Sequence, residues 1–96
     1  MKIKWHDING VEFEIDVPSG ELSYSINQGG EIGYDYHGRV SRVGNNNIGY
    51  DYQGRVSIVG NNNIGYDYQG RVSKIGYLEI KYDYNGRFSG TSGYIN

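Results

Sequence analysis

Residues 48–63 read IGYDYQGRVSIVGNNN, and the same pattern occurs on both sides of this stretch. Residues 32–47 read IGYDYHGRVSRVGNNN, residues 64–79 read IGYDYQGRVSKIGYLE, and residues 80–93 read IKYDYNGRFSGTSG. The sequence therefore repeats with a period of 16 residues, and a fixed period is the signature of a repeat architecture. Ten successive residues are identical in the second and third copies, which indicates either a recent duplication or deliberate engineering.

Each repeat predicts one β-hairpin. Residues 48–51 lead in and residues 55–59 lead out, and both segments are rich in the Tyr, Ile and Val that favour strands. Between them, Asp51 can accept a backbone hydrogen bond and Gly54 can adopt a positive φ, so we expect a type I turn that closes with a Gly bulge. A two-residue turn at Gln53-Gly54 is the alternative. Residues 60–63, Gly-Asn-Asn-Asn, are expected to form the tight polar connector to the next hairpin.

The side-chain pattern within a repeat predicts which face is buried. Ile48, Tyr50 and Tyr52 alternate with smaller or polar residues, so they share one face if the strand is regular. Val56 and Val59 are three residues apart and cannot share a face of a regular strand. Either a bulge lies between these two valines, or the sheet buries side chains on both faces.

The first 31 residues resemble weaker copies of the same hairpin, since they alternate apolar and polar residues around Gly-containing turns. We predict one all-β domain over residues 1–96, an antiparallel β-hairpin repeat meander of about ten to twelve short strands. Degenerate hairpins cover residues 1–31, and four repeats, one hairpin per 16 residues, cover residues 32–96. The pattern leaves open whether the sheet stays open, closes or stacks on itself. Before the first repeat, strands are expected at residues 2–5, 11–17 and 22–26, and turns at residues 7–10, 18–20 and 27–30.

The composition excludes several classes of protein. The chain has 96 residues, a formal net charge of −2 and no cysteine, so it has no disulfide framework and no thiol nucleophile. Its mild acidity argues against nucleic-acid binding. It shows no signal-peptide pattern and no apolar run of roughly 18 residues, so no membrane segment is expected. Its location stays open between the bacterial cytoplasm and a module excised from a larger protein.

No catalytic or metal-binding constellation is predicted. His37 occupies a turn position that holds Gln or Asn in the other repeats, as expected for a surface residue, and His6 precedes a turn beside Trp5. The loop patterns that bind nucleotides or calcium are missing. We therefore expect no enzymatic activity, no cofactor and no metal.

Two ladders of side chains run through the repeats. In each repeat an Asp is followed four residues later by an Arg, which places the two across the hairpin as an ion pair. The predicted turn residues are Asp35, Gly38, Arg39, Asp51, Gly54, Arg55, Asp67, Gly70, Arg71, Asp83, Gly86 and Arg87. A pair of tyrosines in each repeat either packs the sheet or forms a surface of rings for a sugar, a cation or a partner protein. These candidate ligand-binding residues are Tyr34, Tyr36, Tyr50, Tyr52, Tyr66, Tyr68, Tyr82 and Tyr84.

The run from Tyr50 to Ser57, Tyr-Asp-x-x-Gly-Arg-Val-Ser, resembles the YD repeat of Rhs-type and teneurin-type proteins. Matching runs begin at Tyr34, Tyr66 and Tyr82, and the resemblance covers residues 32–90. In that family the repeats form β-hairpin ribbons that wind into large shells and are not catalytic, so the resemblance implies a scaffold. A looser resemblance, to the aromatic hairpin repeats of choline-binding and glucan-binding modules, implies a ligand site instead.

The sequence thus predicts a structural or interaction scaffold with no enzymatic activity. A meander leaves two open sheet edges, which pair with other chains unless they are protected, so a homo-oligomer or a protein partner is expected. Residues 1–31 have a net charge of −4 and residues 32–96 of +2, which hints at head-to-tail association. The alternative is a module that binds a glycan or a cation with its tyrosines. Neither nucleic acid nor a membrane is expected as a partner.

Overall fold

In the computed structural model, which describes residues 1–26 and 31–96, the chain forms eleven short strands and these residues contain no helix. The all-β prediction is confirmed, and the number of strands lies within the predicted range. The strands are β1 (Lys2–His6), β2 (Glu12–Asp16), β3 (Leu22–Ser25), β4 (Ile32–Tyr34), β5 (Val40–Val43), β6 (Asn46–Tyr50), β7 (Val56–Val59), β8 (Asn62–Tyr66), β9 (Val72–Ile75), β10 (Leu78–Tyr82) and β11 (Phe88–Ser92).

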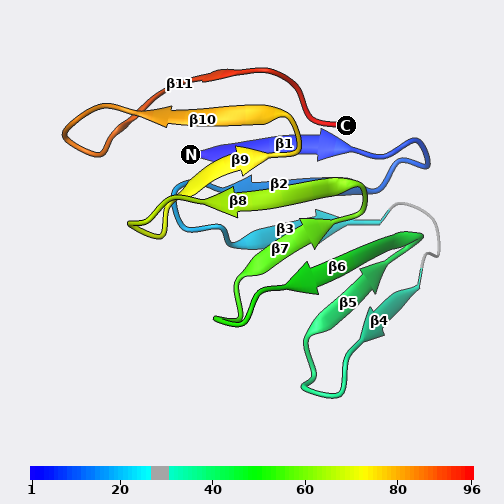
Figure 1. Cartoon of the computed structure of the whole chain (residues 1–96). Helices are drawn as coiled ribbons and strands as arrows, with labels where there is room; N and C mark the ends of the chain where they lie inside the picture. The colour runs from blue at the N-terminus through cyan, green and yellow to red at the C-terminus, as the bar shows by residue number, and fades with distance from the viewer. Residues whose placement is uncertain (27–30) are drawn as a thin grey trace.

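The strands form two antiparallel sheets. A three-stranded sheet has the order β1-β2-β3, and an eight-stranded sheet has the order β11-β10-β9-β8-β7-β6-β5-β4, so sequence neighbours are spatial neighbours within each sheet (Figure 1). The meander of hairpins is therefore confirmed, with a break between β3 and β4. The connector expected at residues 27–30 lies outside the described residues.

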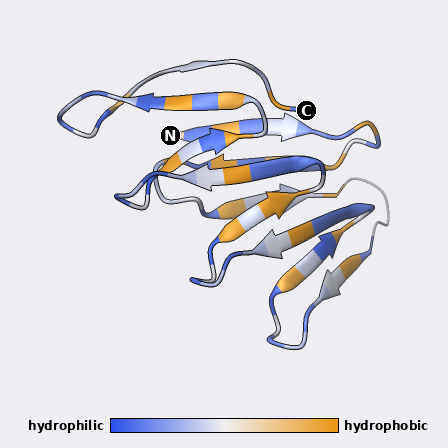
Figure 2. Ribbon diagram, in the orientation of Figure 1, coloured by the Kyte–Doolittle hydropathy of each residue, from blue (hydrophilic) through white to orange (hydrophobic). Residues whose placement is uncertain are grey.

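The two sheets share one apolar core. The three-stranded sheet lies against one face of the eight-stranded sheet (Figures 1 and 2). The buried cluster takes four residues from the N-terminal segment and seven from the repeats: Val11, Phe13, Ile15, Val17, Val43, Ile48, Val59, Ile64, Val72, Ile75 and Ile80. Of the three arrangements that the sequence left open, stacking is therefore the one that forms. An open repeat sheet has an apolar face that needs a cover, and the N-terminal hairpins provide it.

The turn at the tip of each hairpin is the bulged three-residue connection. The Asp51 N–H donates to the carbonyl of Arg55, the Gly54 N–H donates to the carbonyl of Asp51, and both distances are 2.9 Å. Gly54 has a φ of 84°, which side chains rarely tolerate. The glycines of the other three repeats share this φ, and Gly10 and Gly20 in the N-terminal segment are at 86°. The turn at Gly10 has the same hydrogen bonds as the repeats, from Asp7 to Val11, whereas the turn at Gly20 is one residue longer, because the Gly20 N–H donates to Asp16 and the Asp16 N–H donates to Glu21.

A second irregularity explains the spacing of the two valines in the outgoing strand. Tyr50 pairs with Val56 and Gly49 pairs with Ile58, so Ser57 is left over as a bulge. The bulge turns both valines of the strand toward the shared core. Of the two alternatives left open by the sequence, the structure therefore contains the bulge between the valines. Ile58 lies on the other face and is exposed, as residues with charged counterparts in neighbouring repeats should be.

Each bulge requires a glycine on one side of the strand pair. A Cβ at Gly49 would lie 3.2 Å from the Cβ of Ile58, and the same crowding occurs in the first and third repeats. In the last repeat this strand position is Lys81, and its partner across the pair is Gly90. The glycine has moved to the opposite strand, which keeps the pair free of a second Cβ.

Two expectations about the repeat are wrong. Tyr52 does not share a face with Ile48, because the strand ends before it and the ring projects from the turn, 95% exposed. The connector between hairpins has two residues, Gly60 and Asn61, since Asn62 already begins β8. Gly60 has a φ of 61° as the first of these two residues, which is the position that glycine takes in a type II′ hairpin turn.

Candidate functional site: the joint between repeats

The hairpin tip is organised around the aspartate. One carboxylate oxygen of Asp51 accepts hydrogen bonds from the N–H groups of Gln53 and Arg55, both at 2.9 Å. The other oxygen accepts from the Nε of Arg55 at 2.8 Å. The carboxylate therefore closes the turn and also fixes the direction of the guanidinium group.

The guanidinium group points at the next repeat. The Cζ atom of Arg55 lies 4.1 Å from the ring centroid of Tyr66, which is the distance of a cation–π contact. The hydroxyl of Tyr66 then donates to the main-chain carbonyl of Val56 at 2.7 Å. Here β7 and β8 pair at only two positions beside their turn, so the Tyr ring bridges strands that diverge. We call this set of contacts, Asp and Arg of one repeat with Tyr of the next, the inter-repeat latch.

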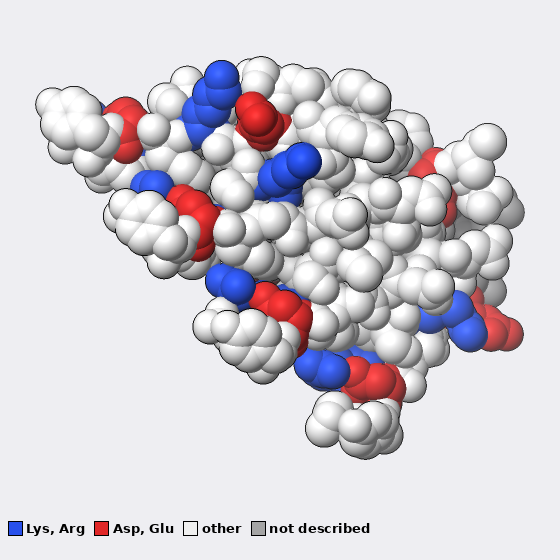
Figure 3. Space-filling view, in the orientation of Figure 1, with Lys and Arg blue, Asp and Glu red and all other residues white. Residues whose placement is uncertain are grey.

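The latch occurs three times with almost the same geometry. In the two other latches the Arg–Tyr distances are 4.3 and 4.4 Å and the Asp–Arg distances are 2.8 Å. Figure 3 shows the ion pairs as adjoining red and blue groups along the edge where the hairpin tips lie. The three latches are Asp35–Arg39–Tyr50, Asp51–Arg55–Tyr66 and Asp67–Arg71–Tyr82.

The structure divides the eight candidate tyrosines into two groups. Three inner tyrosines belong to the latches, and the fourth, Tyr34, lies at the free edge of the sheet. The outer tyrosines project from the hairpin tips and are 94–99% exposed: Tyr36, Tyr52, Tyr68 and Tyr84. The two tyrosines of each predicted pair therefore do not form one surface. In each latch the guanidinium group already occupies the ring face that a cation from solution would contact.

The turn keeps the aspartates in their charged form. Partial burial favours the neutral acid, but the backbone and guanidinium hydrogen bonds from the following Arg, helped by a further turn N–H, outweigh it. The pKa values of Asp35, Asp51 and Asp67 therefore lie below the ordinary value of 3.8. A carboxylate whose pKa is lower in the folded chain stabilises the fold above its unfolded pKa, and that stabilisation is lost as the pH falls through the folded pKa.

We expect the free energy of unfolding to decrease when the pH is lowered below about 4, and to change little above it. Urea titrations at a series of pH values measure this dependence. The acid-sensitive part should shrink in the Asp35→Asn, Asp51→Asn, Asp67→Asn triple variant, although Asp7 and Glu14, whose pKa values are also lowered, keep some of it. Equal acid sensitivity in the triple variant and the parent chain would contradict the assignment to the latches.

The inner tyrosines carry a shift of the opposite kind. Burial raises the pKa of Tyr50, Tyr66 and Tyr82, and the nearby guanidinium group opposes this only in part. These hydroxyls therefore stay protonated and remain donors to the carbonyls they face.

Removing one of these donors should be measurable. Tyr66→Phe leaves the carbonyl of Val56 without this donor, so we expect a loss of about 1 kcal/mol in the free energy of unfolding. Tyr68→Phe is the matched control, because its ring projects into solvent from the adjacent turn. Denaturant midpoints of the two variants give the comparison, and identical midpoints would show that the hydroxyl contributes nothing.

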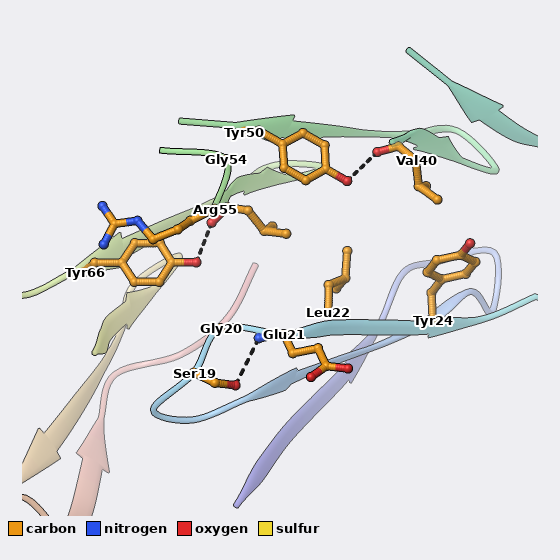
Figure 4. A pocket seen from close by; sticks show the side chains of 11 residues that line it. Ser19, Gly20, Glu21, Leu22, Tyr24, Val40, Tyr50, Gly54, Arg55 and Tyr66 are labelled. Atoms are coloured by element: carbon orange, nitrogen blue, oxygen red, sulfur yellow. Dashed lines mark hydrogen bonds between the residues drawn. The ribbon is translucent and has the colours of Figure 1, made fainter. Parts of the chain in front are cut away.

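The latches also face the N-terminal sheet. A groove of about 460 Å³ lies between β3 and the hairpins that follow it. Figure 4 shows Leu22 and Tyr24 pointing from β3 toward the side of the groove formed by Val40, Tyr50 and Tyr66. Two of the inner rings, Tyr50 and Tyr66, thus line the space between the two sheets as well as the space between repeats.

Amide side chains organise the opposite ends of the strands. The Nδ2 of Asn46 donates to Asp7 at 2.7 Å, which ties the first hairpin turn to the repeat sheet. The buried side chain of Asn62 donates to and accepts from the backbone of Asn96, at 3.1 and 3.0 Å. These asparagines therefore fasten the first hairpin turn and the C-terminal residue to the repeat sheet, next to the Gly-Asn turns.

Both histidines lie on the surface. The ring of His37 lies against that of Tyr36 at the tip of the first repeat, and His6 is exposed at the end of β1. Within residues 1–26 and 31–96, no three His, Asp or Glu side chains gather into a group that could hold a metal ion. The same residues include no helix suited to crossing a membrane.

The sequence analysis missed the contact between Arg and the Tyr of the next repeat. The signal was present, because every latched Arg is followed eleven residues later by its Tyr. Pairing within one flat hairpin does not include this contact, because the Arg and the Tyr belong to successive hairpins. The contact forms where these hairpins diverge from their connector. Comparison with family models, curated proteins and solved structures gives no match, so the function is inferred from the latches and the sheet edges alone.

Proposed function

We propose that this protein is a structural repeat scaffold without enzymatic activity that associates with other copies of itself. The observation that carries the proposal is the pair of edge strands, β4 and β11, which end the eight-stranded sheet and have no strand on their outer side within residues 1–26 and 31–96. Unpaired strand edges are templates for pairing with another chain. The resemblance of the repeats to YD repeats supports a scaffold role.

The use of the polar side chains supports a structural role as well. Each repeated carboxylate closes a turn, and three of the four orient a guanidinium group over a ring, so these groups are engaged in holding hairpins together. Catalysis usually relies on one distinct constellation of groups, whereas the described latches are three near-identical copies.

Sedimentation velocity over a wide range of protein concentrations tests the proposal. We expect the weight-average sedimentation coefficient to rise with concentration. A single species with the mass of one chain, 10.8 kDa, at every concentration would overturn the proposal.

The outer tyrosines favour a second candidate function, glycan binding. Four nearly fully exposed rings, one at the tip of each repeat hairpin, expose an unusual amount of apolar surface for a small protein. A row of rings suits a polymer with repeated apolar sugar faces, because each ring adds a similar contact. Calorimetry with a panel of oligosaccharides tests this function, which predicts several equivalent sites per chain and a smaller binding heat in the Tyr52→Ala, Tyr68→Ala double variant, which keeps two of the four rings.

A further inference from the structure

The ladder of latches is incomplete at the last repeat. The side chain of Arg87 is 76% exposed, whereas the three arginines that contact a Tyr ring are 26–38% exposed. Its Nε lies 3.3 Å from Asp83, compared with 2.8 Å in every complete latch. No aromatic ring covers its guanidinium group in the part of the chain that the structure describes. The ion pair is thus looser where the ring is missing.

The opposite end of the sheet has the complementary deficiency. Tyr34 in β4 occupies the position of the latched tyrosines, but its side chain is 63% exposed. The residue eleven positions before it is Ser23, so no arginine precedes this ring at the required spacing. Its hydroxyl has no hydrogen-bond partner among residues 1–26 and 31–96.

We propose that Tyr34 of one copy completes the latch at Arg87 of another copy. This inference rests on the self-association proposed above and assigns its joint. The guanidinium group of Arg87 would cover the ring of Tyr34, and the Tyr34 hydroxyl would donate to the main-chain carbonyl of Phe88. Phe88 occupies the position of Val40, Val56 and Val72, whose carbonyls accept the corresponding hydroxyls within the chain.

A second copy fits this site because the joint continues an interface that already exists in the chain. Neighbouring strands are antiparallel throughout the eight-stranded sheet, and β4 and β11 are its two edges. β4 of one copy would follow β11 of the other as β10 follows β9. The contact is heterologous, so each added copy presents a new free end and the assembly grows as an open chain.

The last strand makes the joint between copies weaker than the joints within the chain. Thr91 pairs with Ile80, where the buried Ile75 pairs with Ile64 in the repeat before. A joint without that buried aliphatic side chain depends more heavily on the latch. Assembly is therefore expected to be reversible and to respond strongly to the loss of either latch residue.

Two complementary variants test the joint. Arg87→Ala removes one end of the joint, Tyr34→Ser removes the other, and both side chains are exposed, so folding should persist. In sedimentation velocity, each variant alone should be a monomer. A one-to-one mixture should form dimers and nothing larger, because only the intact ring of one variant meets the intact guanidinium group of the other. Tyr52→Ala, which removes an exposed ring away from the joint, should assemble like the parent chain.

The outcomes separate the joint from the proposed function. If the parent chain assembles and the two variants assemble equally well, the joint is wrong while self-association stands. A parent chain that stays monomeric overturns both. If Tyr34→Ser changes the circular dichroism spectrum, Tyr34→Phe provides the readout, since it keeps the ring and removes only the hydroxyl. It should weaken assembly several-fold, and unchanged assembly would overturn the hydrogen bond to Phe88.

Discussion

Phe13→Ala should lower the free energy of unfolding by about 3–5 kcal/mol, which is the usual cost of truncating a buried aromatic side chain. Phe13 is 2% exposed and belongs to the cluster in which the N-terminal sheet meets the repeats. A domain of this size typically has a total stability of about 5–15 kcal/mol, so the variant should unfold far more readily than the parent chain.

Denaturation followed by tryptophan fluorescence measures this effect in the N-terminal sheet. Trp5 is the single tryptophan of the chain, and its ring centroid lies 5.7 Å from that of Phe13, so its emission reports on the N-terminal sheet. Ile8→Ala is the control, because Ile8 is fully exposed and its loss should change stability by less than about 0.5 kcal/mol. Equal midpoints for the two variants would show that the N-terminal sheet does not cover the repeats.

Gly76→Ala should cost about 2–4 kcal/mol, from backbone strain and from the displacement of a buried amide. Gly76 has a φ of 61°, and a Cβ at this position would overlap the side-chain oxygen of Asn62. That amide is 3% exposed and holds the backbone of Asn96 through two hydrogen bonds. The substitution therefore strains the two-residue turn that begins at Gly76 and also loosens the C-terminal residues.

The matched control is Gly54→Ala, which has the strain without the overlap. Gly54 has a φ of 84° and open space around a Cβ, so its loss should cost only about 1–2 kcal/mol. Thermal melts of the two variants separate the two contributions. Equal melting temperatures would mean that the contact with Asn62 is not part of the native packing.

Local turn chemistry made the hairpins predictable from the sequence. A hydrogen-bonding Asp and a Gly three residues later are sufficient to select the bulged turn, and the same pattern made the turn at Gly10 predictable as well. The prediction for Tyr52 was wrong because β6 ends at Tyr50, and Tyr52 already belongs to the turn. Alternation of side chains has no meaning beyond that point.

The arrangement of the two layers and the latch depended on contacts that no local pattern contains. The first N-terminal turn has the same chemistry as the turns of the repeats, so nothing near Phe13 indicates that these strands form a separate sheet. The Arg–Tyr contact needs the divergence of successive hairpins, which follows from the bulge at Ser57 and the two-residue connector together. The constant spacing of eleven residues is the sequence trace of that geometry.

A double-mutant cycle on Arg55 and Tyr66 tests most directly whether the latch holds one repeat to the next. The cycle compares Arg55→Ala, Tyr66→Leu and the double variant by urea denaturation, and the account predicts a coupling energy of about 0.5–2 kcal/mol. Arg39 and Tyr82 belong to different latches, so the corresponding cycle on that pair should be additive within about 0.5 kcal/mol. Additivity for Arg55 and Tyr66 as well would contradict the latch.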